Sequence, residues 1–153
     1  MQGINLMSHI NNQIRDRLYE IIDDLAFFSG RVYKMRSYAL DDAKLPAAVV
    51  YTNSQSSSLA TIGTMTLMAS LEVIVEVFIK GPSGTVVNQI DDACALIENA
   101  IGADFQLSGL VKSCILSRSD ININVEGDQP VANARLSYSV QYVTSLADLE
   151  TAR

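Results

Sequence analysis

Apolar side chains recur every three or four residues at two places in this chain, and each recurrence predicts an amphipathic helix. The first stripe runs from position 10 to position 28 and comprises Ile10, Ile14, Leu18, Ile21, Leu25 and Phe28. Ser8 is expected to cap the start of this helix and Gly30 to end it. The second stripe lies in a helix that Gly102 is expected to end, and comprises Val87, Ile90, Cys94, Ile97 and Ile101.

Alternation of apolar and polar positions predicts the strands. Residues 64–80 and 132–142 alternate most clearly, so each is expected to turn one face toward the helices. Shorter strands are expected at residues 31–35, 47–51, 110–116 and 121–125, with loops or turns at residues 37–46 and 127–130. Along the chain, hairpin connections between the predicted strands outnumber crossover connections through a helix. We therefore expect an α+β fold, a single mainly antiparallel or mixed β-sheet with two amphipathic helices packed on it.

The length of 153 residues predicts one domain. We place it at residues 8–146, between an N-terminal extension of residues 1–7 and a C-terminal tail of residues 147–153. Residues 52–58 are polar throughout and have no apolar face to pack, so a mobile loop is expected there. It contains Asn53, Ser54, Gln55, Ser56, Ser57 and Ser58.

Composition and charge narrow the class of protein. Hydrophobic residues make up 48% of the chain and charged residues 18%, which is too apolar for a disordered protein. The net charge of −6 argues against specific nucleic-acid binding, which calls for a basic surplus. With so few charges, some apolar surface should stay exposed, and such patches usually mark partners. Neither a secretory leader nor a membrane-spanning helix is expected, and hence no membrane partner.

Residues able to bind metal or act as nucleophiles are sparse. Cys94 and Cys114 are the only cysteines and His9 is the only histidine, whereas a zinc site needs three or four such ligands. We therefore expect two reduced thiols in the core and no metal site. A serine triad would have to use His9, which we interpret instead as a structural residue.

Three acidic doublets, one turn and two tyrosines complete the candidate chemistry. The doublets are Asp23-Asp24, Asp41-Asp42 and Asp91-Asp92, and we interpret them as solvated surface. The turn at residues 81–85 follows a strand and opens a helix, but it lacks the lysine of a phosphate-binding loop. Ser83 or Thr85 is expected to cap that helix. Tyr138 and Tyr142 are expected in the core or an interface. We expect no enzymatic activity and no cofactor.

Two segments carry a resemblance to a known family. They are residues 45–52, LPAAVVYT, and residues 126–144, EGDQPVANARLSYSVQYVT. With the order of the predicted elements, they resemble the tail terminator proteins of long-tailed bacteriophages, also called minor tail protein U-like proteins. The resemblance covers residues 8–146.

The resemblance implies a structural protein of the virion that is assembled in the host cytoplasm. It implies a hexameric ring at the head-proximal end of the tail tube. The ring stops tube polymerisation and provides the surface for head–tail joining, so its partners are the tail tube protein and the head–tail connector protein. It implies no enzyme, cofactor or metal. The net charge of −6 would then let DNA pass through an acidic lumen without sticking.

The resemblance also gives the predicted loop a role. We expect residues 52–64 to order on contact with the tube or connector, so that deleting residues 54–58 spares folding and impairs tail completion. Two alternatives remain open at this point. The chain is a head–tail connector or completion protein or a tube-like structural subunit, or it is a small cytoplasmic ligand-binding or enzymatic domain that uses the turn at residues 81–85.

Overall fold

The computed structural model describes residues 9–34, 45–63, 65–124, 130–145 and 148–152. Its elements are α1 (Ile10–Asp23), the 3-10 helix η1 (Ala26–Phe28), β1 (Val32–Tyr33), β2 (Ala47–Thr61), β3 (Thr66–Lys80), α2 (Ser83–Ala103), β4 (Ser113–Asn124), β5 (Val131–Ser145) and β6 (Asp148–Ala152). The sheet order is β1-β2-β3-β5-β4, and β6 pairs with β5. All of these pairs are antiparallel except β1–β2. The predicted α+β fold is confirmed.

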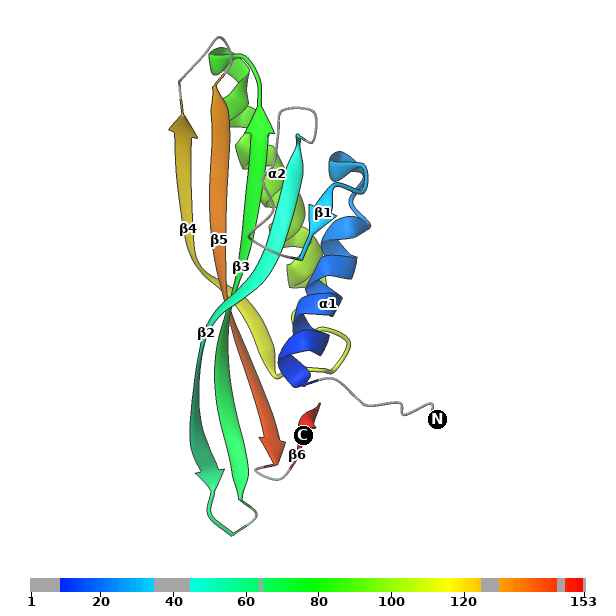
Figure 1. Cartoon of the computed structure of the whole chain (residues 1–153), viewed down its shortest axis with the longest axis vertical. Coiled ribbons are helices and arrows are strands. Elements are labelled where there is room, and N and C mark those ends of the chain that lie inside the picture. Colours follow the sequence, from blue (N-terminus) through cyan, green and yellow to red (C-terminus); the bar gives the residue numbers. More distant parts are fainter. Residues whose placement is uncertain (1–8, 35–44, 64, 125–129, 146–147, 153) are drawn as a thin grey trace.

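Both helices cover the same face of the sheet (Figure 1). The alternation predicted for β3 and β5 sets this face, because every second residue of each strand enters the core. The central side chains of the core come from α1, α2, β3 and β5 and include Ile14, Leu18, Ile90, Ile97, Val73, Val75, Leu136 and Val140. Tyr138 and Tyr142 lie on this face and are each 2% exposed, so their predicted core position is confirmed.

The opposite face of the sheet carries a second, smaller core. Val49, Tyr51 and Ile74 are buried there, with Tyr33 and Phe78 packed against them. Glu76 is only 9% exposed, and its Oε1 accepts a hydrogen bond of 2.5 Å from the Tyr51 hydroxyl. The bond satisfies a carboxylate that burial alone would penalise.

The helix boundaries differ from the prediction in detail. α1 ends at Asp23 because Leu25 adopts an extended backbone, and η1 then carries Phe28 into the core. Gly30, with φ of 78°, therefore follows the 3-10 turn and not the α-helix. The cap of α1 is His9, whose Nδ1 accepts from the Asn11 backbone N–H at 3.0 Å. Ser8 lies outside the described residues.

α2 confirms the predicted stripe except at one position. Val87 is 43% exposed, because Val86 occupies the core position four residues before Ile90. The helix is capped by Pro82 without a side-chain hydrogen bond, so the predicted cap by Ser83 or Thr85 is wrong. The Thr85 hydroxyl instead donates to the Pro82 carbonyl. α2 ends at Ala103, one residue beyond Gly102.

Three predicted strand boundaries are wrong. The two strands expected between residues 110 and 125 are one strand, β4, with a register shift between Leu116 and Arg118 that interrupts the sequence alternation. The predicted mobile loop belongs to β2. Part of the predicted C-terminal tail forms β6, which pairs with the end of β5. Most of the loops expected at residues 37–46 and 127–130 lies outside the described residues. No helix in the described ranges is long and apolar enough to cross a membrane.

Candidate functional site

The hairpin of β2 and β3 extends beyond the helices and forms a projecting arm (Figure 1). The end of β5 lies beside it and pairs with β3 as far as Thr66 opposite Ser145. In the arm, β2 and β3 pair in antiparallel register from Ser54 opposite Glu72 to Thr61 opposite Thr66. All six predicted contact residues lie in the β2 strand of this arm, and residues 53–61 are exposed. The loop prediction is wrong because backbone hydrogen bonds to β3 supply the order that the polar side chains cannot. Their contact with a partner stays a prediction.

A closed ring of three hydrogen bonds fastens the arm to the body of the protein. The Asn11 Nδ2 donates to Gln55 Oε1 at 2.6 Å, and the Gln55 Nε2 donates to the Tyr142 hydroxyl at 3.0 Å. The Tyr142 hydroxyl in turn donates to Asn11 Oδ1 at 2.7 Å. Burial raises the pKa of Tyr142. We call these three residues the arm root, because they join α1, β2 and β5 where the arm begins.

The far end of the arm is apolar. We define the hairpin tip as Leu59, Ile62, Met65 and Met68, which are 49%, 80%, 40% and 46% exposed. Residues 45–71 contain no charged side chain, although the chain carries a net charge of −6. The tip is therefore a neutral apolar projection, a kind of surface that usually marks a partner.

A hollow of about 440 Å³ lies where the arm meets the body, and hydroxyl groups line most of it. Ser54 and Ser56 of β2 line it with Ser70, Glu72, Ser117 and Ser139. The Asn53 side-chain amide donates to the Glu72 carboxylate at its rim. Three predicted residues, Ser54, Gln55 and Ser56, thus share one hollow, and Ser57 lies on the face toward the helices by register.

A second cavity, of about 350 Å³, lies between the end of α2 and the start of β4. We call it the α2–β4 cleft; its lining includes Glu98, Ile101, Phe105, Cys114, Ile115 and Tyr138. Phe105 is 50% exposed and Ile115 is 59% exposed. The buried Tyr138 hydroxyl has no hydrogen-bond partner within the described ranges. Burial raises the pKa of Tyr138, and it raises that of Cys114 to about 12.

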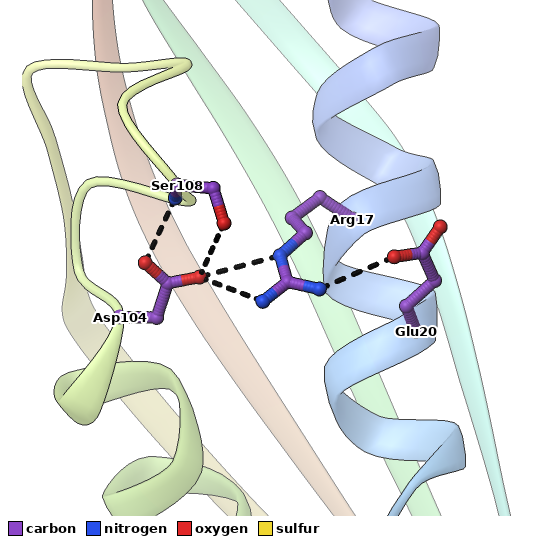
Figure 2. A network of polar contacts seen from close by, with 4 residues as sticks. All are labelled: Arg17, Glu20, Asp104 and Ser108. Atoms are coloured by element: carbon purple, nitrogen blue, oxygen red, sulfur yellow. Dashed lines mark hydrogen bonds and ion pairs between the residues drawn. The ribbon is translucent and has the colours of Figure 1, made fainter.

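An ion-pair network holds the loop that borders this cleft (Figure 2). The Arg17 Nε and Nη2 of α1 donate to Asp104 Oδ2 at 3.2 and 3.0 Å, and Nη1 donates to Glu20 at 3.2 Å. Asp104 Oδ1 accepts from the Ser108 backbone N–H at 2.8 Å. The Ser108 N–H and then Arg17 lower the pKa of Asp104. The same carboxylate raises the pKa of Arg17.

The remaining candidate residues are the two thiols and the acidic doublets. Cys94 and Cys114 are buried free thiols, and burial raises the pKa of Cys94 to about 11. Asp91 and Asp92 are exposed on α2, whereas Asp41-Asp42 lies outside the described residues. Within the part of the chain that the structure describes, no three His, Cys, Asp or Glu side chains are grouped to hold a metal ion.

Sequence reasoning missed the α2–β4 cleft and the arm root. Phe105, an apolar residue just beyond the end of the predicted helix, was a signal for the cleft. Asn11 and Tyr142 carry no local signal, because their contact spans 131 residues of chain.

No protein family and no curated protein matches this chain. Solved structures do match it. One is a chain of a structure described as "Virion of native gene transfer agent (GTA) particle", at 12% identity and a TM-score of 0.42. The match covers 84% of this chain and 94% of that chain. A likeness at that identity and TM-score carries no argument about the function of this chain.

Proposed function

We propose that this chain is a structural, non-catalytic subunit of a phage tail terminator. Six copies form a ring on the head-proximal end of the tail tube, stop tube polymerisation and present the surface that meets the head–tail connector. The resemblance of residues 45–52 and 126–144 to that family motivates the assignment. The observation that carries it is that one chain bears two exposed apolar surfaces, the hairpin tip and the α2–β4 cleft.

Two unlike surfaces on one chain favour a head-to-tail contact over a two-fold one. Repeated head-to-tail contacts generate a ring when the rotation closes and a filament when it does not. A ring subunit must leave apolar surface exposed as a monomer, because its neighbours cover that surface in the assembly. The exposed fractions of Ile62, Phe105 and Ile115 fit this requirement.

The charge of α2 suits a ring through which DNA passes. Asp91 and Asp92 are exposed on this helix, which contains no lysine or arginine. A surface of this sign repels the phosphate backbone. The proposal therefore expects no tight DNA binding at moderate salt, and a nanomolar dissociation constant for duplex DNA at about 0.15 M salt would contradict this part of it.

Tube capping tests the function directly. Purified protein is added to growing tail tubes of the same particle, and tube lengths and ends are measured by electron microscopy. The expected result is a ring at one end only and arrested growth. A mass near 100 kDa, six times 16.6 kDa, is expected for the ring. Tubes that keep growing in its presence would overturn the proposal.

Labelling of intact virions separates the terminator from its structural alternatives. The terminator is expected at a single level between tube and connector. If the label for this chain runs along the whole tube, the chain is a tube-like subunit. If the label stays on heads that have lost their tails, the chain is a connector.

A further inference from the structure

The hairpin tip is the most exposed apolar part of the described chain. Ile62 is 80% exposed, and Leu59 and Met68 are each nearly half exposed. Residues 53–61 of β2 are exposed on both faces of the strand. The helices lie along the other part of the sheet (Figure 1). The tip cannot fold back on its own strands, since cross-strand pairing continues to Thr61 opposite Thr66.

The α2–β4 cleft is a concave apolar surface with an unmet hydrogen bond. Phe105 and Ile115 stand exposed at it, while Ile101 and Cys114 are buried in its wall. Tyr138 lines it at 2% exposure, and its hydroxyl has no partner among the residues described. Burying a hydroxyl without a hydrogen-bond partner is unfavourable, so a polar group of a bound segment that reached it would gain a hydrogen bond.

The tip and the cleft of one chain cannot meet. The cleft residues 114–116 of β4 lie level with residues 71–73 of β3, through β5. The last paired residue of the arm, Thr66, is five to seven residues further along β3. At about 3.3 Å per residue this is a separation of about 17–23 Å along a rigid hairpin.

We propose that the hairpin tip of one copy docks in the α2–β4 cleft of a second copy of this chain. The inference rests on the proposed ring and names the contact that builds it. Charge favours this occupant: Glu98 lines the cleft and Asp91 and Asp92 lie on the same helix, so acidic segments of a second copy are repelled. Residues 45–71 are the long uncharged stretch that approaches without that repulsion.

Three single substitutions at exposed positions test the contact. Ile62→Asp places a charge on the tip and Phe105→Asp places one in the cleft. Thr85→Asp is the matched control, because Thr85 is exposed at the opposite end of α2, where a carboxylate suits the helix N-terminus. Masses are measured by native mass spectrometry and light scattering. The first two variants should weaken association at least about 30-fold, and the control should assemble like the wild type.

Mixing the variants gives the sharpest outcome. The Ile62→Asp chain keeps an intact cleft and the Phe105→Asp chain keeps an intact tip. An equimolar mixture should form a 1:1 pair near 33 kDa, twice 16.6 kDa, and nothing larger. Ile115→Asp replaces the cleft variant if Phe105→Asp unfolds at a lower temperature than the wild type.

Several results would overturn the docking. They are a mixture that stays monomeric, a tip variant that retains the wild-type mass and loses only tube binding, and a wild-type chain that remains at 16.6 kDa at millimolar concentration. Failure of the proposed function looks different: the masses follow the expectation, but the assembled protein does not arrest tube growth.

Discussion

The Gln55 side chain donates a hydrogen bond of 3.0 Å to the hydroxyl of Tyr142, 87 residues away in the chain, at the point where the arm leaves the body. Asn11 closes the ring by bonding to both. The arm root therefore fixes the direction of β2 relative to α1 and β5 where β2 becomes solvent-exposed on both faces.

Replacing Tyr142 by Phe should destabilise the protein. The substitution removes two hydrogen bonds of the arm root and leaves the amides of Asn11 and Gln55 short of a partner. We expect the free energy of unfolding to fall by about 1–2 kcal/mol in a urea titration. Tyr138→Phe is the matched control on the same face of β5: its hydroxyl has no partner among the described residues, so its removal should be neutral or stabilising. Equal losses in the two variants would contradict the role of the arm root.

Asp104 should make stability depend on pH in the acid range. Because the Ser108 N–H and Arg17 lower its pKa in the folded state, its carboxylate stabilises the protein above the ordinary pKa of 3.8. That contribution is lost as the pH falls below 3.8 through the lowered pKa of the folded state. Urea titrations from neutral to acid pH should find that the wild type has the larger free energy of unfolding at neutral pH. Its difference from Asp104→Asn should shrink as the pH falls below 3.8.

Asp120→Asn is the control for this pH dependence. Asp120 pairs with Arg118 at 2.9 Å, but both side chains are at least half exposed, so the pair should contribute little. If the difference in free energy of unfolding between wild type and Asp104→Asn does not change with pH, the charge of the carboxylate does not contribute to stability.

The two thiols should react only when the protein opens. The thiolate is the reactive form, and burial raises the pKa of Cys94 to about 11 and that of Cys114 to about 12. At about pH 8, labelling by a disulfide reagent should be slower than for free cysteine by at least about 100-fold, and rapid in denaturant. Cys94→Ser isolates the signal of Cys114. Rapid labelling of the native protein would place a thiol at the surface of the α2–β4 cleft.

Deleting residues 54–58 should harm the fold, contrary to the expectation from sequence. The deletion removes five paired residues of β2, including Gln55 of the arm root. Replacing Ser54, Ser56 and Ser58 by Ala instead keeps the strand, and stability should change by no more than about 0.5 kcal/mol per site. Thermal unfolding distinguishes the two variants. Only the alanine variant then reports on a partner contact in assembly assays.

The sequence was sufficient for the elements whose faces enter one core. The stripe from Ile10 to Ile21 and the alternation along β3 and β5 reflect burial against a common partner, and burial leaves a periodic signal. Val87 was misplaced because two adjacent valines both fit the helical period. Val86 is inside because it lies on the same face of α2 as Ile90, Ala93 and Ile97, which the core buries.

The arm and the cleft were not predicted, because neither leaves a periodic pattern in the sequence. Residues 53–58 form a strand through backbone bonds to β3, and backbone bonds leave no trace in a run of serines. The cleft depends on how the end of α2 lies over β4, which brings Phe105 next to Ile115 and Tyr138. That adjacency follows from tertiary packing and from a register that no local pattern specifies.

The distance of about 17–23 Å along the strands between Thr66, at the end of the arm, and the cleft constrains how a ring can be built. Copies related by pure rotation touch only at points of equal height along the rotation axis. If the strands stood upright, parallel to that axis, each step from tip to cleft would climb by this distance, and the copies would wind into an open spiral. A closed ring therefore requires the strands to lie nearly tangential, so that the long dimension of each subunit runs around the circumference and the wall stays thin and shallow.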